Sequence, residues 1–370
     1  MSLTSLRQLH EAAGAQYGED TSLPRSYGDV RAEYAAIRGG VAVIDFSPES
    51  KLEVSGQNAV QFINGLVTNE VKTLPSGHGV PAAFLDAHGK VSALCHIYNI
   101  DGRLLLLLHP ERREKIYDSL KRFTLAGEFF LTDLTEQQAL ISLQGPRAAA
   151  LLASLTGAAV SENEISITER VIAAQTVLVA THARCGAAGF DLFVAAEAAP
   201  QVWQAIIARG AEYGARAVGQ AAFEIARIEA AVPREGIDVN NTHILLEAGL
   251  DNSVSYTKGC YLGQEIIARI HWRGQPARQL MKLAVSADAP PPAGTELYAS
   301  DGKKVGAITS STCSLAGGEI IALGYVHRYY LTPGTELTVR HGETEIGKAT
   351  VVARPATAAQ PQPEAQTSKS

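Results

Sequence analysis

The chain has 370 residues, of which 46% are hydrophobic and 19% are charged, and its formal net charge at pH 7 is −6. This composition is that of a globular protein with enough apolar residues to form a sizeable core. The negative charge argues against direct binding to nucleic acid and against binding to anionic membranes.

The first part of the chain is predicted to alternate short strands with helices. Alternating or short apolar runs predict strands at residues 41–46, 51–54, 91–98 and 104–108. Asp101-Gly102 predicts a hairpin turn between the last two of these strands, because glycine accepts the positive φ of such a turn. Helices are predicted after Gly56, where Ala59, Phe62, Ile63 and Leu66 have helical spacing, and at residues 109–122.

A second unit is predicted to begin near Thr135. It contains strands at residues 139–143, 171–180 and 190–194, and helices after Gly145-Pro146 and at residues 200–210 and 220–232. Beyond a proline-rich linker near residue 290, short strands alone are predicted, at residues 305–309, 320–326, 336–340 and 349–353. This pattern is typical of a small barrel or sandwich. Residues 357–370 are rich in Ala, Pro, Gln and Ser, and they are predicted to be disordered.

The four cysteines lie far apart and form no C-x-x-C pair: Cys95, Cys185, Cys260 and Cys313. Their spacing predicts neither a zinc site nor a secreted disulfide framework. Residues 1–20 lack the apolar core of a signal peptide. The most apolar runs, 104–108 and 148–153, are too short to span a bilayer. We therefore expect a cytoplasmic protein with no membrane partner.

Residues 258–282 form the segment of the chain with the densest set of chemically active side chains. The segment carries one acid, Glu265, and five basic residues, so its net charge is +4 in a chain of net charge −6: Lys258, Arg269, Arg273, Arg278 and Lys282. His271 and Trp272 lie among them. Such a segment fits an aromatic anionic ligand.

Cys260 lies just ahead of a predicted helix N-terminus, since Gly263-Gln264-Glu265 precedes an apolar pair. Glu265 would lie in the first turn, where a negative charge is favourable against the helix dipole. The helix N-terminus and the nearby Lys258 would both favour the thiolate form of Cys260. Buried, inert cysteines are common, so from these residues alone a packed Cys260 is an equally good interpretation. Tyr261 and the neighbouring glycines fit either a turn or a core contact.

The octapeptide K-G-C-Y-L-G-Q-E resembles the hallmark of the YgfZ family, a branch of the glycine-cleavage T-protein superfamily. Its residues are Lys258, Gly259, Cys260, Tyr261, Leu262, Gly263, Gln264 and Glu265. Further matches to the superfamily cover nearly the whole chain, at residues 54–69, 143–146 (L-Q-G-P), 227–230 (R-x-E-A), 246–250 and 305–310. The resemblance implies an α+β, three-lobed T-protein-like fold with a central opening. Two α/β lobes with antiparallel sheets are expected, plus a C-terminal small β-barrel.

The resemblance also implies a division of the chain and a ligand. Residues 1–280 would form the folate-binding region, with one lobe made of about residues 1–50 and 135–280 and the other of residues 51–134. Residues 281–356 would form the barrel. Tetrahydrofolate, or a folate derivative, would bind in the central opening.

Asp191 is the candidate partner of the pterin, because G-F-D-L-F-V at residues 189–194 resembles the strand that carries an acid in aminomethyltransferases. A carboxylate suits the pterin edge, since it accepts two N–H donors at once; an ordinary strand aspartate is the alternative. Further folate contacts are assigned to Tyr98, Arg227, Glu229 and Arg269. Lys258 and Arg269 would lower the pKa of Cys260 or hold the glutamate tail of the folate.

The chain departs from the aminomethyltransferases at their acid pair. Those enzymes carry G-G-x-x-D-D, and one of its aspartates assists transfer at a folate nitrogen. Here Ala93 and Leu94 stand at the two acid positions, and an apolar side chain cannot exchange a proton. Phe223 also stands where those enzymes have an arginine. The aminomethyltransferases also lack the cysteine of K-G-C-Y. The loss of the two acids and the gain of this thiol both favour the YgfZ branch.

Membership of the YgfZ branch implies a role in assembling or maintaining iron–sulfur clusters, including those of radical-SAM tRNA-modifying enzymes. We hypothesise that Cys260 ligates a transient cluster jointly with an iron–sulfur protein or cluster carrier, since one thiolate cannot complete a four-thiolate site. One alternative is a tetrahydrofolate-dependent aminomethyl or one-carbon transferase. Another is a folate-binding scaffold in which Cys260 is only packed. The sequence leaves open the recipient protein, the fate of the folate and the oligomeric state.

Overall fold

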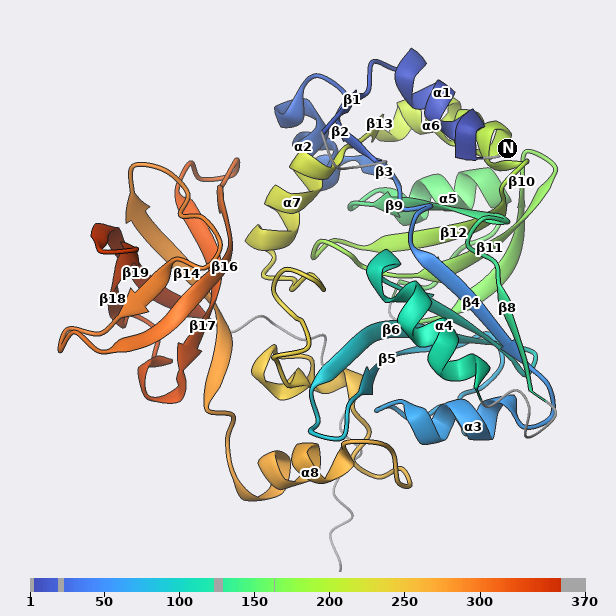
Figure 1. Ribbon diagram of the computed structural model, residues 1–370. Coiled ribbons are helices and arrows are strands. Elements are labelled where there is room, and N and C mark those ends of the chain that lie inside the picture. The colour runs from blue at the N-terminus through green and yellow to red at the C-terminus, as the bar shows by residue number, and fades with distance from the viewer. Residues whose placement is uncertain (1–2, 19–22, 123–128, 163, 354–370) are drawn as a thin grey trace, which may run out of the picture.

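A computed structural model describes residues 3–18, 23–122, 129–162 and 164–353. It contains two lobes built around separate sheets and a third lobe that is a closed barrel (Figure 1). This arrangement confirms the predicted α+β fold of two α/β lobes and a C-terminal small β-barrel. The tail predicted to be disordered, 357–370, lies outside the described residues.

The first lobe is built on a six-stranded sheet that is antiparallel except where β3 pairs with β13. Helices α1 (Leu3–Ala12), α5 (Ala148–Thr156) and α6 (Ala199–Gly210) cover one face of the sheet through apolar residues such as Leu6, Leu151 and Trp203. In sheet order the strands are β10 (Ile167–Ile172), β11 (Gln175–Thr181), β12 (Gly189–Ala195), β9 (Gln138–Gln144), β3 (Val41–Asp45) and β13 (Ala215–Ala217).

The second lobe is built on a five-stranded antiparallel sheet. Alternate residues of its long strand β6, such as Cys95 and Ile97, pack with Ile63 of α3 (Ala59–Leu66) and Ile116 of α4 (Arg113–Lys121). The opposite face packs against the first lobe, because Leu105 and Leu107 share a core with Ile44 and Phe193. In sheet order the strands are β5 (Gly79–Leu85), β6 (Val91–Ile100), β7 (Arg103–Leu108), β4 (Ser50–Ser55) and β8 (Phe130–Asp133).

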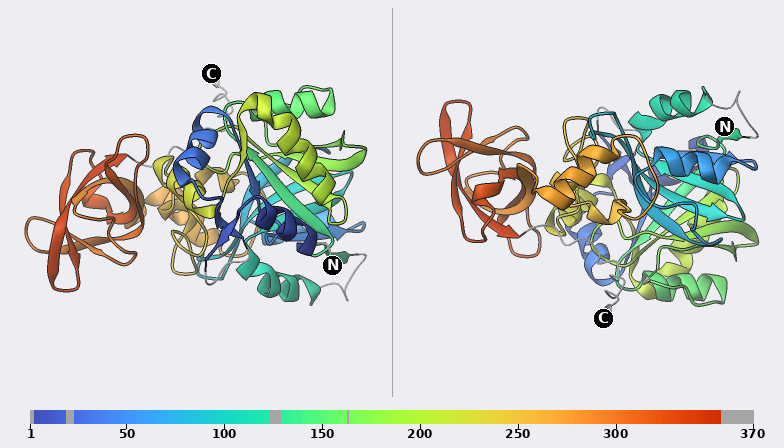
Figure 2. Two further views of the ribbon diagram at one scale, coloured as in Figure 1. Left: turned by 90° about the horizontal axis from the view of Figure 1, so that it is seen from above. Right: turned by 90° about the horizontal axis from the view of Figure 1, so that it is seen from below.

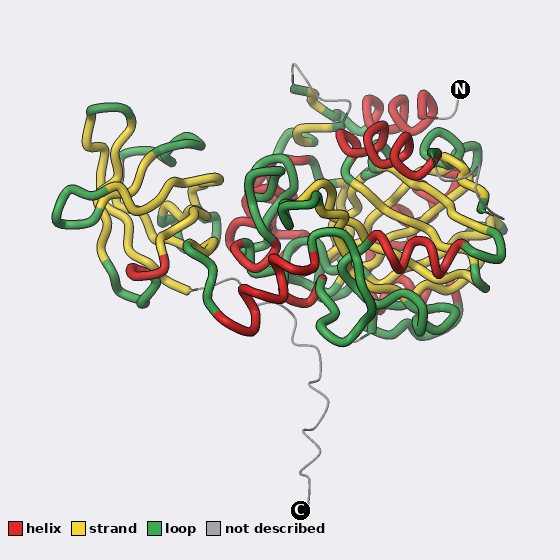
Figure 3. Tube along the Cα trace, turned by 60° about the horizontal axis from the view of Figure 1, so that its bottom comes forward, coloured by secondary structure: helices red, strands yellow, loops and turns green. Residues whose placement is uncertain are grey.

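A mostly non-strand segment lies between the two sheets and the barrel, which occupies one end of the molecule (Figure 2). It contains α7 (Gln220–Glu229), 3-10 turns at Leu245–Glu247 and Asp251–Ser253, and α8 (Gln264–Arg273), from which the chain enters the barrel (Figure 3). The barrel closes in the order β14 (Arg278–Ala287), β17 (Ile320–His327), β16 (Lys304–Cys313), β15 (Glu296–Tyr298), β18 (Glu336–His341) and β19 (Thr344–Ala353). The chain also contains β1 (Gln16–Tyr17), β2 (Pro24–Ser26), α2 (Val30–Gly39) and 3-10 turns at Pro110–Arg112, Ala211–Tyr213 and Arg328–Tyr330. The lobe limits expected from the resemblance stay a prediction.

Several predicted elements agree with the structure, and one is wrong. The helix at residues 59–66 and the hairpin turn at Asp101-Gly102 are confirmed. The single strand predicted at residues 171–180 is instead a hairpin, in which β10 ends at Ile172 and β11 begins at Gln175. Its turn residues, Ala173 and Ala174, have φ of 52° and 61°. Because alanine rarely adopts positive φ, the sequence gives no turn signal there. Among the described residues, no helix is long and apolar enough to cross a membrane.

Candidate functional site

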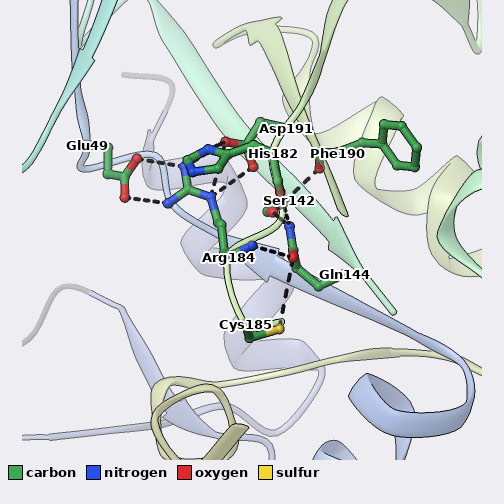
Figure 4. Close-up of polar contacts among 8 residues, drawn as sticks. All are labelled: Glu49, Ser142, Gln144, His182, Arg184, Cys185, Phe190 and Asp191. Atoms are coloured by element: carbon green, nitrogen blue, oxygen red, sulfur yellow. Dashed lines mark hydrogen bonds and ion pairs between the residues drawn. The ribbon is translucent and has the colours of Figure 1, made fainter. Parts of the chain in front are cut away.

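The Asp191 carboxylate is buried in the centre of β12 and is bonded to two cationic or ionisable side chains (Figure 4). The Arg184 guanidinium donates from Nε to Oδ1 at 3.0 Å and from Nη2 to Oδ2 at 2.6 Å. The His182 ring lies with Nδ1 2.7 Å from Oδ2. Burial raises the pKa of Asp191, but Arg184 and then His182 outweigh it and hold this pKa below its usual range.

Arg184 bonds a second carboxylate and makes a cation–π contact with an aromatic ring. Its Nη1 and Nη2 atoms donate to Glu49 at 2.7 and 2.8 Å, and its Cζ lies 4.2 Å from the centroid of the Phe46 ring. The Arg184 side chain is 8% exposed. One guanidinium thus joins Glu49, just ahead of β4, to the strand that carries Asp191, in a buried ion triplet.

The loop that carries Arg184 is held in place by its backbone. Gln144 at the end of β9 donates from Nε2 to the His182 carbonyl at 2.9 Å and accepts the Arg184 N–H at 2.9 Å. Ser142 fixes the same amide from β9, at 2.9 Å (Figure 4). Cys185 is fully buried, and burial raises the pKa of its thiol to about 11. The L-Q-G-P match therefore has a structural role in shaping the loop.

Two side chains of β6 face this cluster from the other lobe. The His96 ring centroid lies 4.0 Å from that of His182, and burial, followed by the charge of His182, lowers the pKa of His96 well below its ordinary value. Tyr98, on the same face of β6, is completely buried, and its hydroxyl has no hydrogen-bond partner among the described residues. Asp191 and Tyr98, both predicted as folate contacts, are thus brought to one region between the sheets.

Arg227 and Glu229 make internal contacts that connect α7 to the barrel and to α2. Arg227 is 2% exposed and donates to Asp238 at 2.5 Å and to Ser310 of β16 at 2.9 Å. Glu229 accepts from the Tyr34 hydroxyl, and from Ser314 at 2.7 Å. These contacts give both residues a structural role, while their assignment as folate contacts stays a prediction.

Lys258 is buried, and its ammonium group binds backbone rather than ligand. Its Nζ donates to the carbonyl oxygens of Asn64, Val67 and Asn69 at 2.6, 2.7 and 2.7 Å. An ammonium has three donors, so these bonds use all of them. Burial lowers the pKa of Lys258 to about 8. The motif lysine therefore fastens the segment to the end of α3, and its predicted effect on Cys260 or a folate tail stays a prediction.

Cys260 is exposed and lies four residues ahead of α8, which begins at Gln264 with Glu265 in its first turn, as predicted. Gly263 has φ of 80°, and a Cβ there would lie 2.6 Å from the carbonyl oxygen of Asp86. Gly259, by contrast, has open space beside it, and Arg269 is exposed on α8. The interpretation in which Cys260 is packed in the core is therefore wrong.

Tyr261 brings the motif together with one of the two acid positions. Its ring is buried in an apolar cluster with Leu245 and Ile267, and burial raises the pKa of its hydroxyl to about 12. Leu94 packs at the edge of the same cluster, while Ala93 is fully buried on the other face of β6. Phe223, at the place of an arginine, packs edge to face on Phe46 at 5.2 Å.

Glu235 is a buried acid that no sequence motif indicates. Its Oε2 accepts a hydrogen bond from the backbone N–H of Leu94 at 3.1 Å. Leu94 has no partner on β7, because the pairing of β6 with β7 ends at Cys95 and Leu108. The Oε1 atom of Glu235 accepts from Arg112 at 3.0 Å. Burial raises the pKa of Glu235 to about 7, although Arg112 opposes the shift. Glu235 belongs to none of the sequence motifs described above. Its proximity to Leu94 arises from tertiary structure alone.

The described residues contain no group of three or more His, Cys, Asp or Glu side chains placed to hold a metal ion.

Two α/β lobes with antiparallel sheets and a closed six-stranded barrel define the class of three-lobed proteins with the glycine cleavage T-protein architecture. Residues 6–258 match the family model of the GCVT N-terminal domain, and residues 278–357 match that of the glycine cleavage T-protein C-terminal barrel domain. The chain therefore belongs to the glycine cleavage T-protein family. A crystal structure of the glycine cleavage system aminomethyltransferase T from Bartonella henselae has the same fold, with a TM-score of 0.84 and 22% identity over 95% of this chain and 96% of that one.

Curated relatives of similar length carry the name aminomethyltransferase. The protein of Symbiobacterium thermophilum is 30% identical over 348 residues, which cover 91% of this chain and 92% of that protein. The protein of Desulforamulus reducens is 28% identical over 95% of this chain and 97% of its own length. A putative chloroplastic transferase of Arabidopsis thaliana is 28% identical over 82% of this chain and 69% of its own length.

Proposed function

We propose that this chain is a tetrahydrofolate-binding protein of the YgfZ branch that supports iron–sulfur proteins through Cys260. The observation that carries this proposal is that the Cys260 thiol is exposed close to one of the two acid positions. The residue after Cys260, Tyr261, packs in the same apolar cluster as Leu94. An apolar side chain thus lies where a proton-exchanging acid is expected, and a soft donor is exposed nearby. The polar cluster around Asp191 is the proposed site for the pterin of the folate.

The proposed partner is an iron–sulfur protein or cluster carrier that supplies the other ligands, since one thiolate cannot complete a cluster site. Radical-SAM tRNA-modifying enzymes are the proposed clients.

The test compares Cys260→Ser with Cys313→Ser, because both thiols are exposed but only the first belongs to the motif. We expect Cys260→Ser to abolish recovery of cluster-enzyme activity in cells that lack this protein. Cys313→Ser should retain full recovery, and both variants should bind tetrahydrofolate like the wild type. Equal recovery by the two variants would remove Cys260 from the function.

A second candidate function is tetrahydrofolate-dependent aminomethyl transfer, and the relatives favour it over the first. One contact in the structure favours it as well: the Glu235 carboxyl group lies at the backbone of Leu94, with a pKa raised to about 7 by burial. Release of an amine from an aminomethyl group requires a proton for the leaving nitrogen, and an acid that is half-protonated near neutral pH can supply one.

This candidate is tested by a glycine-cleavage assay with aminomethylated lipoyl protein and tetrahydrofolate. Turnover that falls at least about 100-fold in Glu235→Gln would support it, since general acids typically contribute this much. Glu136→Gln, on an exposed side chain, is the matched control. Absence of turnover in the wild type would leave the iron–sulfur role as the proposed function.

A further inference from the structure

The Asp191 carboxylate already has a flat, two-donor partner within the chain. Arg184 directs Nε and Nη2 at the two carboxylate oxygens, at 3.0 and 2.6 Å. This is the side-on, two-bond geometry that gives guanidinium–carboxylate pairs their specificity. His182 takes a further position on Oδ2, at 2.7 Å. Asp191 therefore has no room for a second two-donor partner while Arg184 stays in place.

The surroundings of the guanidinium are those of a recognition site for a flat ring. Its Cζ lies over the Phe46 ring, 4.2 Å from the ring centroid, and the Arg184 side chain is 8% exposed. A carboxylate at the edge, an aromatic ring against the face and exclusion of water together select planar ligands with paired N–H groups.

The edge of a pterin has this same donor pattern. Its amino group and the neighbouring ring N–H are attached to one carbon and point in parallel, so the edge is a cyclic guanidine. We propose that Arg184 occupies the pterin subsite as an internal ligand, and that tetrahydrofolate binds by displacing the guanidinium from Asp191. The inference rests on the proposed binding of folate at Asp191, and it makes Arg184 the residue that sets the affinity of that site.

The structure also shows where the guanidinium would go. Glu49 accepts two hydrogen bonds from Arg184, at 2.7 and 2.8 Å, and its side chain is 19% exposed against 0% for Asp191. Arg184 can therefore leave Asp191 and remain paired with Glu49, nearer the solvent. Because Gln144 and the buried Cys185 hold the loop backbone, only the long side chain has to move.

A competitor inside the protein lowers apparent affinity in proportion to the fraction of molecules in which the subsite is blocked. Removing the competitor should therefore tighten binding, whereas removing its alternative partner should weaken it. The two changes thus have opposite signs, which a role limited to stability would not produce.

The experiment measures tetrahydrofolate binding by calorimetry to the full chain. We expect Arg184→Ala and Arg184→Lys to bind at least about tenfold more tightly than the wild type, since lysine lacks the parallel donors. Glu49→Gln should bind more weakly. Arg209→Ala, which removes an exposed surface pair with Glu212, should bind like the wild type. Methylguanidinium should compete with tetrahydrofolate in Arg184→Ala and have no effect on the wild type.

Arg184→Lys keeps a positive charge beside Asp191, so we expect it to fold even if the alanine variant does not. A folded Arg184→Lys that binds tetrahydrofolate as well as the wild type or less well would overturn the inference while leaving folate binding intact. Failure of the wild type and of both Arg184 variants to bind would overturn the folate proposal, and the inference with it.

Discussion

At the scale of single residues, Glu235 shows how burial changes the chemistry of an ordinary side chain. Its carboxyl group is 6% exposed and is bonded to the Leu94 N–H and to Arg112, with Glu111 adding a further negative charge nearby. Burial is the largest influence on the pKa of Glu235, which rises to about 7. The group therefore changes its charge in the physiological range, which an exposed glutamate does not.

This pKa predicts a pH-dependent contribution to stability. An acid with a raised pKa in the folded state binds its proton more tightly there than in the unfolded chain. The contribution of Glu235 is therefore fully present below the ordinary glutamate pKa and is lost as the pH rises toward 7. From pH 4.5 to 7 the loss is about 3 kcal/mol. Urea unfolding of wild type and Glu235→Gln across this range should show the wild type losing that much relative to the variant.

Glu136→Gln is the control, because the Glu136 side chain is 67% exposed. The difference in stability between the wild type and this variant should stay the same across the pH range. Parallel curves for the wild type and Glu235→Gln would contradict the raised pKa. The same result would weaken the case for Glu235 as a proton donor, because a glutamate with an ordinary pKa is almost fully ionised at neutral pH.

At the scale of elements, Lys258 couples the K-G-C-Y segment to helix α3. The last carbonyl groups of a helix have no partner within it, and a cation near that end is favourable. Lys258 donates to the carbonyl groups of Asn64, Val67 and Asn69. The residue two positions before Cys260 is thus the anchor that fixes how the exposed segment leaves the core.

Lys258→Met should therefore destabilise the protein and loosen the segment. It leaves carbonyl groups in a buried place without donors, and we expect a loss of about 2–4 kcal/mol in the free energy of unfolding. The Cys260 thiol should also react faster with a thiol reagent, because its segment is no longer fixed. Lys72→Met, on an exposed lysine three positions after Asn69, should change neither quantity. Unchanged stability in Lys258→Met would show that the three bonds contribute little.

The sequence predicted elements better than it predicted contacts. The helical spacing of Ala59–Leu66 and the Asp101-Gly102 turn are local signals, and the structure confirms them. The hairpin at Ala173-Ala174 lacks a turn residue, so it was predicted as one strand. Arg184 and Glu49 lie 135 positions apart, and no local pattern relates them. The sequence predicts that Cys260 lies ahead of a helix N-terminus, as α8 confirms, but it leaves open whether the thiol is exposed or packed. The three-carbonyl role of Lys258 depends on chain segments far away in sequence.

At the scale of the whole molecule, Arg227 and Asp238 connect the barrel to the rest of the protein. Asp238 is fully buried and accepts from Arg227 at 2.5 Å and from Ser310 of the barrel at 2.6 Å. Its carbonyl oxygen accepts from the Tyr325 hydroxyl of the barrel at 2.9 Å. This buried ion pair and the hydroxyl groups around it therefore help to hold the barrel against α7, together with the bond between Glu229 and Ser314.

Removing one member of such a pair leaves an uncompensated charge in the interior, which costs about 3–5 kcal/mol. We expect Arg227→Met, which leaves the buried Asp238 without its cation, to lose about this much stability. Asp238→Leu should lose less, because Arg227 still pairs with Glu224 at 2.7 Å. Both variants should increase proteolytic cleavage between α8 and the barrel. The double variant should lose less than the sum of the two, since neither charge is then left unpaired. Unfolding by denaturant measures all three. Additive losses would mean that the two side chains stabilise the protein independently, and that the barrel is held by its apolar contacts with α7 instead.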